Sequence, residues 1–219
     1  MCGRYALHAH PQVIALQFGL AAPLDAAPRY NIAPASEVLI VRAADGARDA
    51  AQVRWGLVPR WAKDPSIGTR LNNARAESIA EKPAFRDAYR RRRCLVPASG
   101  FYEWKAENGR KQPYYIYPSQ GELFALAGLW ERWSGPERSL ETCVIVTTGG
   151  NDKMRAIHDR MPVIVAPADY ALWLDCRPGS DPSALLRPCA PEEIEVRKVS
   201  RAVNNARSDS ASLIEAAEG

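Results

Sequence analysis

Short runs of β-branched, aliphatic and aromatic residues, separated by turn signals, most strongly restrict the fold of this sequence. Residues 38–41 and a run ending at 53–57 are two such segments, with a turn expected between them at Asp45-Gly46. Further strands are predicted at residues 94–96, 100–105, 114–117, 124–130, 142–148, 161–166 and 194–199, and helices at 10–19, 83–89 and 167–174. Many short strands with few helices predict the α+β class, as a β-rich domain of mainly antiparallel strands with flanking helices.

The length of 219 residues is sufficient for one domain with a well-buried core. The sequence has no internal repeat and no long linker rich in Pro, Gly or Ser, so we expect a single domain over residues 1–207. Small and acidic residues predict a loosely held tail at 208–219. Residues 29–34 are expected to form a loop.

Five cysteines without a CxxC pair or a Cys/His cluster argue against a disulfide framework and against structural zinc. We therefore expect a reducing, cytoplasmic environment and neither a metal ion nor a cofactor. No apolar run has the length of a signal peptide or of a membrane-spanning helix. The net charge of +4 permits a polyanionic partner without requiring one.

Cys2 is the first candidate for chemistry, because removal of Met1 would make it the amino terminus. Its α-amine, with an ordinary pKa of about 8, and its thiol, with one of about 8.5, would then form a 1,2-aminothiol. The amine can add to an aldehyde to give a Schiff base, and the thiol can close a five-membered thiazolidine on the same carbon. The alternative is that Cys2 is a small apolar residue that opens the first strand.

The segment 54–61 combines two tryptophans and two arginines where a strand is expected to run into a loop. Stacking of Trp55 and Trp61 on unpaired bases, with Arg60 on the phosphates, is typical of proteins that bind single-stranded nucleic acid. The alternative places both tryptophans in the core. A second basic run at residues 90–93 suits phosphate contacts, but it is better interpreted as a solvated helix end.

Three polar groups are candidates for acid–base chemistry or for orienting a substrate. Asn73 lies in a segment with little apolar content, which is either part of a site or a solvated turn with a helix cap. Glu103 is flanked by aromatic residues on a predicted strand, so its carboxylate needs a partner or a shifted pKa, and the alternative is a structural pair with an arginine. Histidine is the side-chain type best suited to proton transfer near neutral pH, so His158 is either a proton-transfer group or a structural residue.

Seven short motifs occur in order along the chain: Met1-Cys2-Gly3-Arg4, Tyr30-Asn31-Ile32-Ala33-Pro34, Trp55-Gly56-Leu57-Val58-Pro59, Asn73-Ala74-Arg75-Ala76-Glu77, Pro97-Ala98-Ser99-Gly100-Phe101-Tyr102-Glu103-Trp104, Ala127-Gly128-Leu129-Trp130 and His158-Asp159-Arg160-Met161-Pro162. Together they closely resemble the SRAP family, the SOS response-associated peptidase domain. One such motif would be weak evidence, whereas seven in the family's order and spacing are specific. The resemblance extends from Met1 to about Asn205.

The resemblance implies a sensor of abasic sites in single-stranded DNA, especially near a junction with duplex. Cys2 would form a covalent thiazolidine with the aldehyde of the ring-opened deoxyribose. Asn73 would orient Cys2 and the opened sugar, and Glu103 would assist ring opening and proton transfer around the amine. His158 would exchange protons with the sugar oxygens.

The resemblance also implies how the DNA would be held. Contacts with flanking phosphates are implied for Arg4, Arg75 and Arg160. The loop with Pro34 and the loop that contains Trp55, Arg60 and Trp61 would stack on the DNA and wedge it as it bends.

Two other classes of function stay open from the sequence. An N-terminal cysteine peptidase would remove its own Met1 and hydrolyse other amides, with His158 or Glu103 as the base. A non-catalytic reader of modified bases would not need the aminothiol. For the preferred function we expect a monomer in the cytoplasm that associates with the nucleoid when it binds DNA, and an associated lyase activity is compatible with it.

Overall fold

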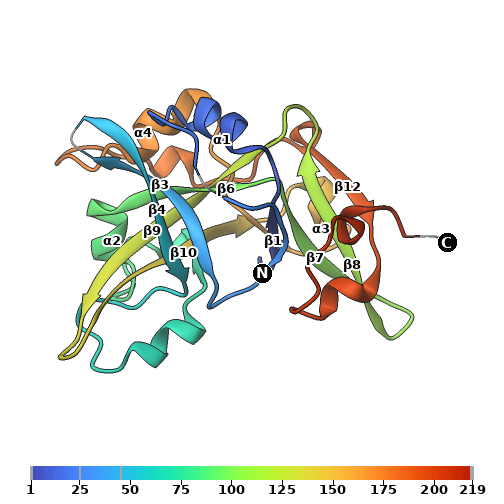
Figure 1. Cartoon of the computed structure of the whole chain (residues 1–219), viewed down its shortest axis with the longest axis horizontal. Coiled ribbons are helices and arrows are strands. Elements are labelled where there is room, and N and C mark those ends of the chain that lie inside the picture. Colours follow the sequence, from blue (N-terminus) through green and yellow to red (C-terminus); the bar gives the residue numbers. More distant parts are fainter. Residues whose placement is uncertain (1, 25, 45, 218–219) are drawn as a thin grey trace.

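The chain folds into two packed sheets of mainly antiparallel strands with a few short helices (Figure 1). The structure, a computed structural model, describes residues 2–24, 26–44 and 46–217. In this part of the chain there are twelve strands and four α-helices. The predicted α+β, β-rich fold class is therefore confirmed. Part of the turn expected at Asp45-Gly46 falls outside the described residues.

Five strands close into a barrel: β3 (Glu37–Ala44), β4 (Ala47–Trp55), β6 (Arg93–Ala98), β9 (Phe124–Ser134) and β10 (Ser139–Gly149). The barrel closes because β9 pairs with both β6 and β10. Strand β10 also pairs with β5 (Asn73–Arg75), in parallel, and with β11 (Arg160–Pro162), in antiparallel orientation. One long strand thus brings three separate segments of the chain together.

The second sheet has the order β12–β8–β7–β1–β2, and all of its neighbouring strands are antiparallel. Its strands are β1 (Tyr5–Leu7), β2 (Arg29–Ile32), β7 (Gly100–Glu107), β8 (Arg110–Pro118) and β12 (Ile194–Lys198). Strand β1 lies at the centre of the molecule, between the barrel and the strands β7, β8 and β12 (Figure 1). The N-terminal residues are consequently enclosed by both sheets.

The helices are short and cover the outside of the sheets. Helix α1 (Pro11–Phe18) has Pro in its first turn and ends at Gly19 in the left-handed conformation (φ 65°), as its sequence predicts. Helix α2 (Arg86–Arg91) begins three residues later than predicted. The predicted helix at 167–174 is a 3₁₀ turn (Pro167–Asp169) followed by α4 (Tyr170–Leu174), and α3 (Asp152–Arg155) was not predicted.

Long-range contacts account for the other differences from the sequence-based expectations. The expected loop at residues 29–34 contains β2, which pairs with β1. The predicted strand at 161–166 is reduced to β11. Arg93 is a buried residue and not part of a solvated helix end, since its guanidinium donates to the carbonyls of Trp173 (2.6 Å), Tyr89 (2.7 Å) and Asp175. Burial of this cation is tolerated because backbone oxygens surround it.

The last described residues lie against the second sheet. The carboxylate of Asp209 accepts a hydrogen bond from the backbone N–H of Tyr30, and Arg197 donates to the carbonyl of Ile214 (2.9 Å). Leu213 is buried. The domain boundary after residue 207 stays a prediction, but these contacts attach the following segment to β2 and β12.

We expect Gly100→Ala to destabilise the fold by about 1–3 kcal/mol, because overpacking strains a close-packed sheet. A Cβ atom on Gly100, where β7 begins, would lie 2.6 Å from the carbonyl oxygen of Ile116 and would clash with the ring of Tyr115. Gly149→Ala is the matched control, because no described atom lies within 4 Å of the equivalent Cβ position. Denaturant unfolding of both variants tests this, and equal stabilities would contradict it.

Candidate functional site

Cys2 lies at the meeting point of the two sheets, next to β7. Strand β1 is antiparallel to β7, with Tyr5 opposite Phe101, and the backbone N–H of Tyr102 donates to the carbonyl of Arg4 (2.9 Å). This pairing places the residues before Tyr5 beside Glu103. The side-chain amide of Asn73, on β5, donates to the carbonyl of Cys2 (2.8 Å). The expected association of Cys2 with Asn73 is thus present as a direct contact.

The thiol of Cys2 is fully buried. Burial, and after it the nearby carboxylate of Glu103, raises the pKa of the Cys2 thiol well above its ordinary value. The sulfur is consequently held as a neutral thiol and not as a free thiolate. Its reaction as a nucleophile requires a neighbouring group that accepts its proton.

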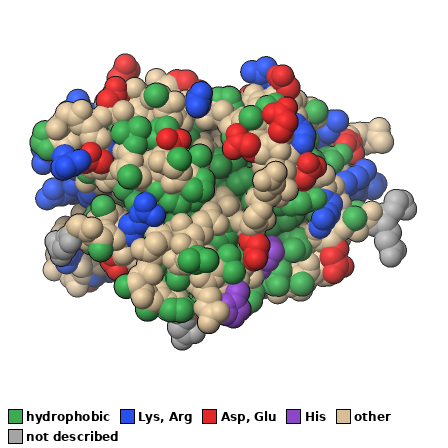
Figure 2. Space-filling model, turned by 90° about the horizontal axis from the view of Figure 1, so that it is seen from above, with side chains coloured by type: hydrophobic (Ala, Val, Ile, Leu, Met, Phe, Trp, Pro, Cys, Tyr) green, Lys and Arg blue, Asp and Glu red, His purple; other side chains and the backbone are tan. Residues whose placement is uncertain are grey.

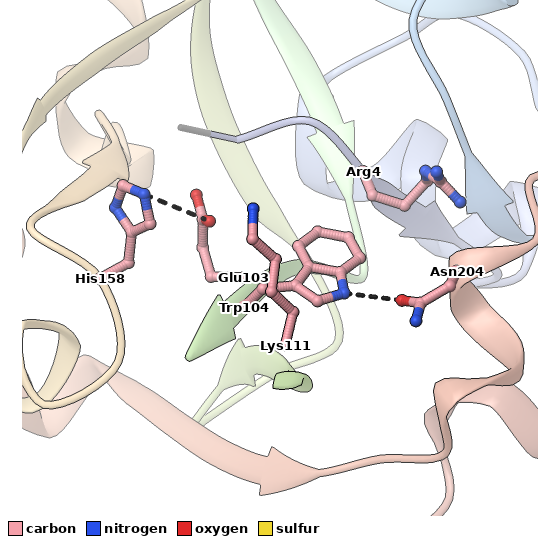
Figure 3. A pocket seen from close by; sticks show the side chains of 6 residues that line it. All are labelled: Arg4, Glu103, Trp104, Lys111, His158 and Asn204. Carbon is pink, nitrogen blue, oxygen red and sulfur yellow. Dashed lines mark hydrogen bonds and ion pairs between the residues drawn. The ribbon is translucent and has the colours of Figure 1, made fainter. Parts of the chain in front are cut away.

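Glu103 is a buried carboxylate with an imidazole beside it. Its side chain is only 2% exposed, and its Oε2 atom lies 3.9 Å from Nε2 of His158 (Figure 3). Burial raises the pKa of the Glu103 carboxyl, and the positive form of His158 counteracts this effect in part. A carboxyl group whose pKa is shifted toward neutrality can both donate and accept protons near pH 7.

The other ring nitrogen of His158 fixes the orientation of the imidazole. Nδ1 lies 2.9 Å from the backbone nitrogen of Arg160 and 2.9 Å from Oδ1 of Asp159. It can form only one of these two hydrogen bonds at a time. With either partner, Nε2 is directed toward Glu103, as the proton-transfer role predicted for this pair requires.

Glu103 and His158 line a polar cavity of about 400 Å³, together with Arg4, Trp104, Lys111 and Asn204. Figure 3 shows the ring of His158 and the carboxylate of Glu103 directed toward each other, with Trp104 and Asn204 on the far side of Glu103. The indole N–H of Trp104 donates to Oδ1 of Asn204 (2.7 Å). The cavity therefore has an aromatic wall as well as cationic and acid–base groups.

Three further residues, which were not predicted from the sequence, belong to the site or support it: Lys111, Asn204 and Asn31. Asn31 accepts a hydrogen bond from the guanidinium of Arg4 (2.7 Å), which also donates to the carbonyl of Val203 (2.8 Å). Asn204 and Val203 belong to a 3₁₀ turn (Arg201–Asn204) nearly 200 residues from Arg4 in the chain. Trp104 could have been recognised as the neighbour of Glu103 and Asn31 as a member of the motif at residues 30–34, but the sequence contains no local signal for Lys111 or Asn204.

A larger cavity, of about 640 Å³, lies on another face of the molecule. Its lining comes from α1, α4, the β8–β9 connection and residues 164–167, and it includes Glu192 and Glu193. Figure 2 shows that face, with apolar side chains at the floor of a hollow and acidic side chains along one side. Because this cavity has carboxylates in its wall and no arginine or lysine, the smaller cavity is the better candidate for an anionic substrate.

Two of the predicted phosphate-binding arginines are positioned by β10. In its pairings, Thr147 lies opposite Arg75 of β5, and Gly149 lies opposite Arg160 of β11. Arg75 is exposed. Arg160 forms a bidentate ion pair with Glu77 (2.6 and 3.0 Å) and donates to the carbonyl of Thr147 (2.7 Å). An incoming phosphate would therefore compete with Glu77 for Arg160.

The predicted stacking residues differ in their exposure. Trp61 is 58% exposed, Arg60 is exposed and Pro34 is half-buried. Trp55, in contrast, is 1% exposed, and its indole donates to the carbonyl of Asn72 (2.9 Å). The prediction that Trp55 stacks on DNA is wrong for this structure, because β4 delivers its ring into the core against Tyr5.

The described residues contain no group of three His, Cys, Asp or Glu side chains arranged to hold a metal ion. None of their helices has both the length and the apolar character needed to cross a bilayer.

The fold and the site define a β-rich domain in which a cysteine near the amino terminus lies beside a buried acid–base pair. Residues 1–206 match the family model for SOS response associated peptidase (SRAP), and the chain belongs to this family. It is 40% identical to the abasic site processing protein YoqW of Bacillus subtilis (strain 168), over 98% of this chain and 99% of that protein. It is 30% identical to the abasic site processing protein YedK of Escherichia coli (strain K12), with the same coverage.

A solved structure has the same fold. It is a protein from Bacteroides thetaiotaomicron that is 26% identical and superposes with a TM-score of 0.90, over 99% of this chain and 100% of that one.

The variant Glu103→Gln is expected to melt at a higher temperature than the parent protein at neutral and alkaline pH. Since burial raises the pKa of Glu103, the folded state binds this proton more tightly than the unfolded chain does. The associated stabilisation is complete below the unfolded pKa of about 4.3 and is lost as the pH rises through the folded pKa. Glutamine does not ionise and avoids this loss.

The measurement is a series of thermal melts between about pH 4 and about pH 8, spanning the ordinary carboxyl pKa. Glu81→Gln, at an exposed position, is the control. A Glu103→Gln variant that is less stable than the parent at the alkaline end would identify a stabilising ion pair and contradict the expectation.

Proposed function

We propose that this protein recognises abasic sites in single-stranded DNA and forms a covalent thiazolidine crosslink with them through Cys2, after Met1 has been removed. One observation carries the proposal: Cys2 is held by Asn73 next to Glu103, which lines a polar cavity together with His158. An abasic site exposes an aldehyde when its sugar ring opens, and a 1,2-aminothiol captures aldehydes. The names of the relatives, which are abasic site processing proteins, agree with this target.

The reaction has three steps. The α-amine of Cys2 adds to C1′ of the aldehyde, and the resulting carbinolamine loses one water to give an imine. The thiol sulfur then adds to the imine carbon while the thiol proton is transferred to the nitrogen. The five-membered ring contains the sulfur, the nitrogen and the former aldehyde carbon, and the whole reaction releases one water. No redox change occurs, so no cofactor is required.

Each proton transfer can be assigned to a group of the site. Glu103 lies near enough to raise the pKa of the Cys2 thiol, and its own raised pKa suits a group that takes up the thiol proton and returns it to the nitrogen. His158 would protonate the sugar oxygen during ring opening and the departing hydroxyl. Asn73 would keep the backbone of Cys2 in place throughout.

The surrounding residues would bind the DNA. Arg4 and Lys111 line the cavity, while Arg75 on β5 and Arg160 on β11 lie on either side of β10. The exposed indole of Trp61 and the loop at Pro34 would stack on bases, which are accessible in a single strand or at a junction with duplex. A monomer suffices for this arrangement, and the protein would be found with the nucleoid while it is bound.

Two side activities use the same groups. The imine before ring closure is also the intermediate from which β-elimination would cleave the strand, so a lyase activity is part of the proposal. The thiol with Glu103 or His158 as base would also serve for self-removal of Met1. A more general peptidase activity needs oxyanion donors, and no observation favours it.

Incubation with a single-stranded oligonucleotide that contains one abasic site should yield an adduct equal in mass to the protein without Met1 plus the oligonucleotide, less one water. Intact mass spectrometry after heating measures the mass of this adduct.

Insertion of Ala before Cys2 should abolish the heat-stable adduct, because the amine and the thiol are then on different residues. Cys2→Ser should give an adduct only after borohydride reduction. A heat-stable adduct with the Ala insertion would refute the thiazolidine.

Glu103→Gln and His158→Ala should each slow adduct formation by about tenfold or more, the ordinary contribution of a general acid or base being about 10²–10⁴-fold. Their affinity for undamaged single strands should stay close to that of the parent, and Glu81→Gln serves as the control for loss of a carboxylate. Gel time courses of crosslinking report the rates. Parent-like rates in both variants would exclude these residues from the chemistry.

A further inference from the structure

A second cationic cavity lies outside the site at Cys2, at the end of β9. Its volume is about 440 Å³, and it is lined by Arg60, Arg92, Glu131, Arg132 and Ser134. These residues come from the loop after β4, from the end of α2 and from β9. Three arginines and one glutamate give the lining an excess of positive charge.

The carboxylate of Glu131 is already engaged. One of its oxygens accepts from the guanidinium of Arg92 (2.7 Å) and the other accepts from the backbone N–H of Arg132 (3.0 Å). Glu141 lies opposite Arg132 across the β9–β10 pair, but its carboxylate forms an ion pair with Arg42 (3.2 Å). Both carboxylates are therefore already engaged by an arginine within the described residues.

Arg60 and Arg132 are both exposed, and within the described residues neither side chain takes part in a hydrogen bond or an ion pair. The segments that carry them are nevertheless fixed to each other. The buried indole of Trp133 donates to the carbonyl of Ala62 (2.7 Å), and Val58 packs in the same small cluster. Two cations, which form no hydrogen bond or ion pair within the described residues, are thus presented by segments that are fixed to each other, although the charge of Arg60 also acts on the carboxylate of Glu131. This arrangement suits an anion.

The position of this cavity relative to Cys2 follows from the pairing of β10. Asn73, which holds Cys2, lies opposite Ile145, and Arg132 lies opposite Glu141 on the other side of β10. Four residues of strand correspond to about 13 Å, and two strand spacings add about 10 Å across the sheet. A few nucleotides of an extended single strand are sufficient to cover this separation.

The residue next to Arg60 supports a nucleic acid as the ligand. Trp61 is one of the few large apolar side chains among the described residues that is mostly exposed, and its indole N–H is fixed to the carbonyl of Pro83 (3.3 Å). An exposed aromatic face beside unpaired guanidinium groups is the arrangement that binds bases and phosphates of a single strand together.

We propose that the cavity at Arg60 and Arg132 binds phosphates of the single-stranded DNA that continues away from the abasic site. This inference rests on the proposed function, since it requires the lesion to lie at Cys2. The flanking strand would stack on Trp61 and place its phosphates against the two guanidinium groups. The cavity therefore acts as a second anchor that increases affinity for lesions with a long unpaired flank.

The test uses the full-length double variant Arg60→Gln/Arg132→Gln and oligonucleotides with a tetrahydrofuran analogue of the abasic site, which cannot open to an aldehyde. One oligonucleotide has about two nucleotides on each side, and two others are extended on one side or the other to about twelve, within the site sizes of single-strand binding proteins. Fluorescence anisotropy over a salt series gives Kd and its salt dependence. The control variant Arg177→Gln/Arg187→Gln also removes two positive charges, but at positions outside this cavity.

The parent should bind one of the two extended oligonucleotides more tightly than the short one. The Kd of the Arg60/Arg132 variant for that extended oligonucleotide should be about tenfold higher than the Kd of the parent. Its slope of log affinity against log salt should be smaller by about 1.4, since each phosphate contact on a single strand contributes about 0.7. The same variant should lose less affinity for the short oligonucleotide than for the extended one, because fewer phosphates of the short oligonucleotide reach the cavity. Arg60→Lys/Arg132→Lys should recover most of the salt slope.

Equal affinities of parent and double variant for both extended oligonucleotides would overturn the proposal, as would an equal loss in the Arg177/Arg187 control. Crosslinking to the short oligonucleotide with a natural abasic site is measured in parallel. If the adduct forms but the flank has no arginine-dependent effect, only the second anchor is wrong. If no adduct forms with the parent, the proposed function itself fails.

Discussion

The pairing of β1 with β7 is the interaction on which the arrangement of the site depends. It connects residues nearly one hundred positions apart, and it brings the segment that contains Cys2 alongside the strand that contains Glu103. Because β1 is also paired with β2 on its other side, the N-terminal segment is an inner strand and not a frayed end. A reactive group on the second residue of a chain acquires a fixed position only through such pairing.

Burial of this segment makes the charged forms of Cys2 and Glu103 unfavourable. Cys2 and Glu103 are both buried where water cannot solvate a charge, so the pKa of the thiol and that of the carboxyl are both raised. A protonated thiol next to a protonated carboxyl group is not an ion pair, and the proposed chemistry would use this arrangement to move one proton. His158, at 3.9 Å, reduces the upward shift of the Glu103 pKa.

The sequence predicted those parts of the structure that depend on local patterns. The strands from residue 94 to residue 148 and helix α1 with its terminal Gly19 follow from periodicity and capping. The motifs contain Cys2, Asn73, Glu103 and His158, which the structure brings close together, and their roles stay predictions. Properties set by distant partners could not be predicted. A loop pattern became β2 because β1 offered hydrogen bonds, and Trp55 is buried because its strand closes a barrel.

The cavity wall beyond Trp104 shows the same limitation and has a functional consequence. Asn204 accepts the indole N–H of Trp104, while Asn31 donates to the carbonyls of Asn205 (3.0 Å) and Ser208 and accepts from Arg4. The polar wall therefore exists only when the C-terminal segment is docked on β2. The hydrogen bond to Asn204 holds the indole of Trp104 in one orientation, so docking of the C-terminal segment determines which face of this ring is turned toward the cavity. The two ends of the chain consequently meet at one cavity, with Arg4 from one end and Asn204 from the other.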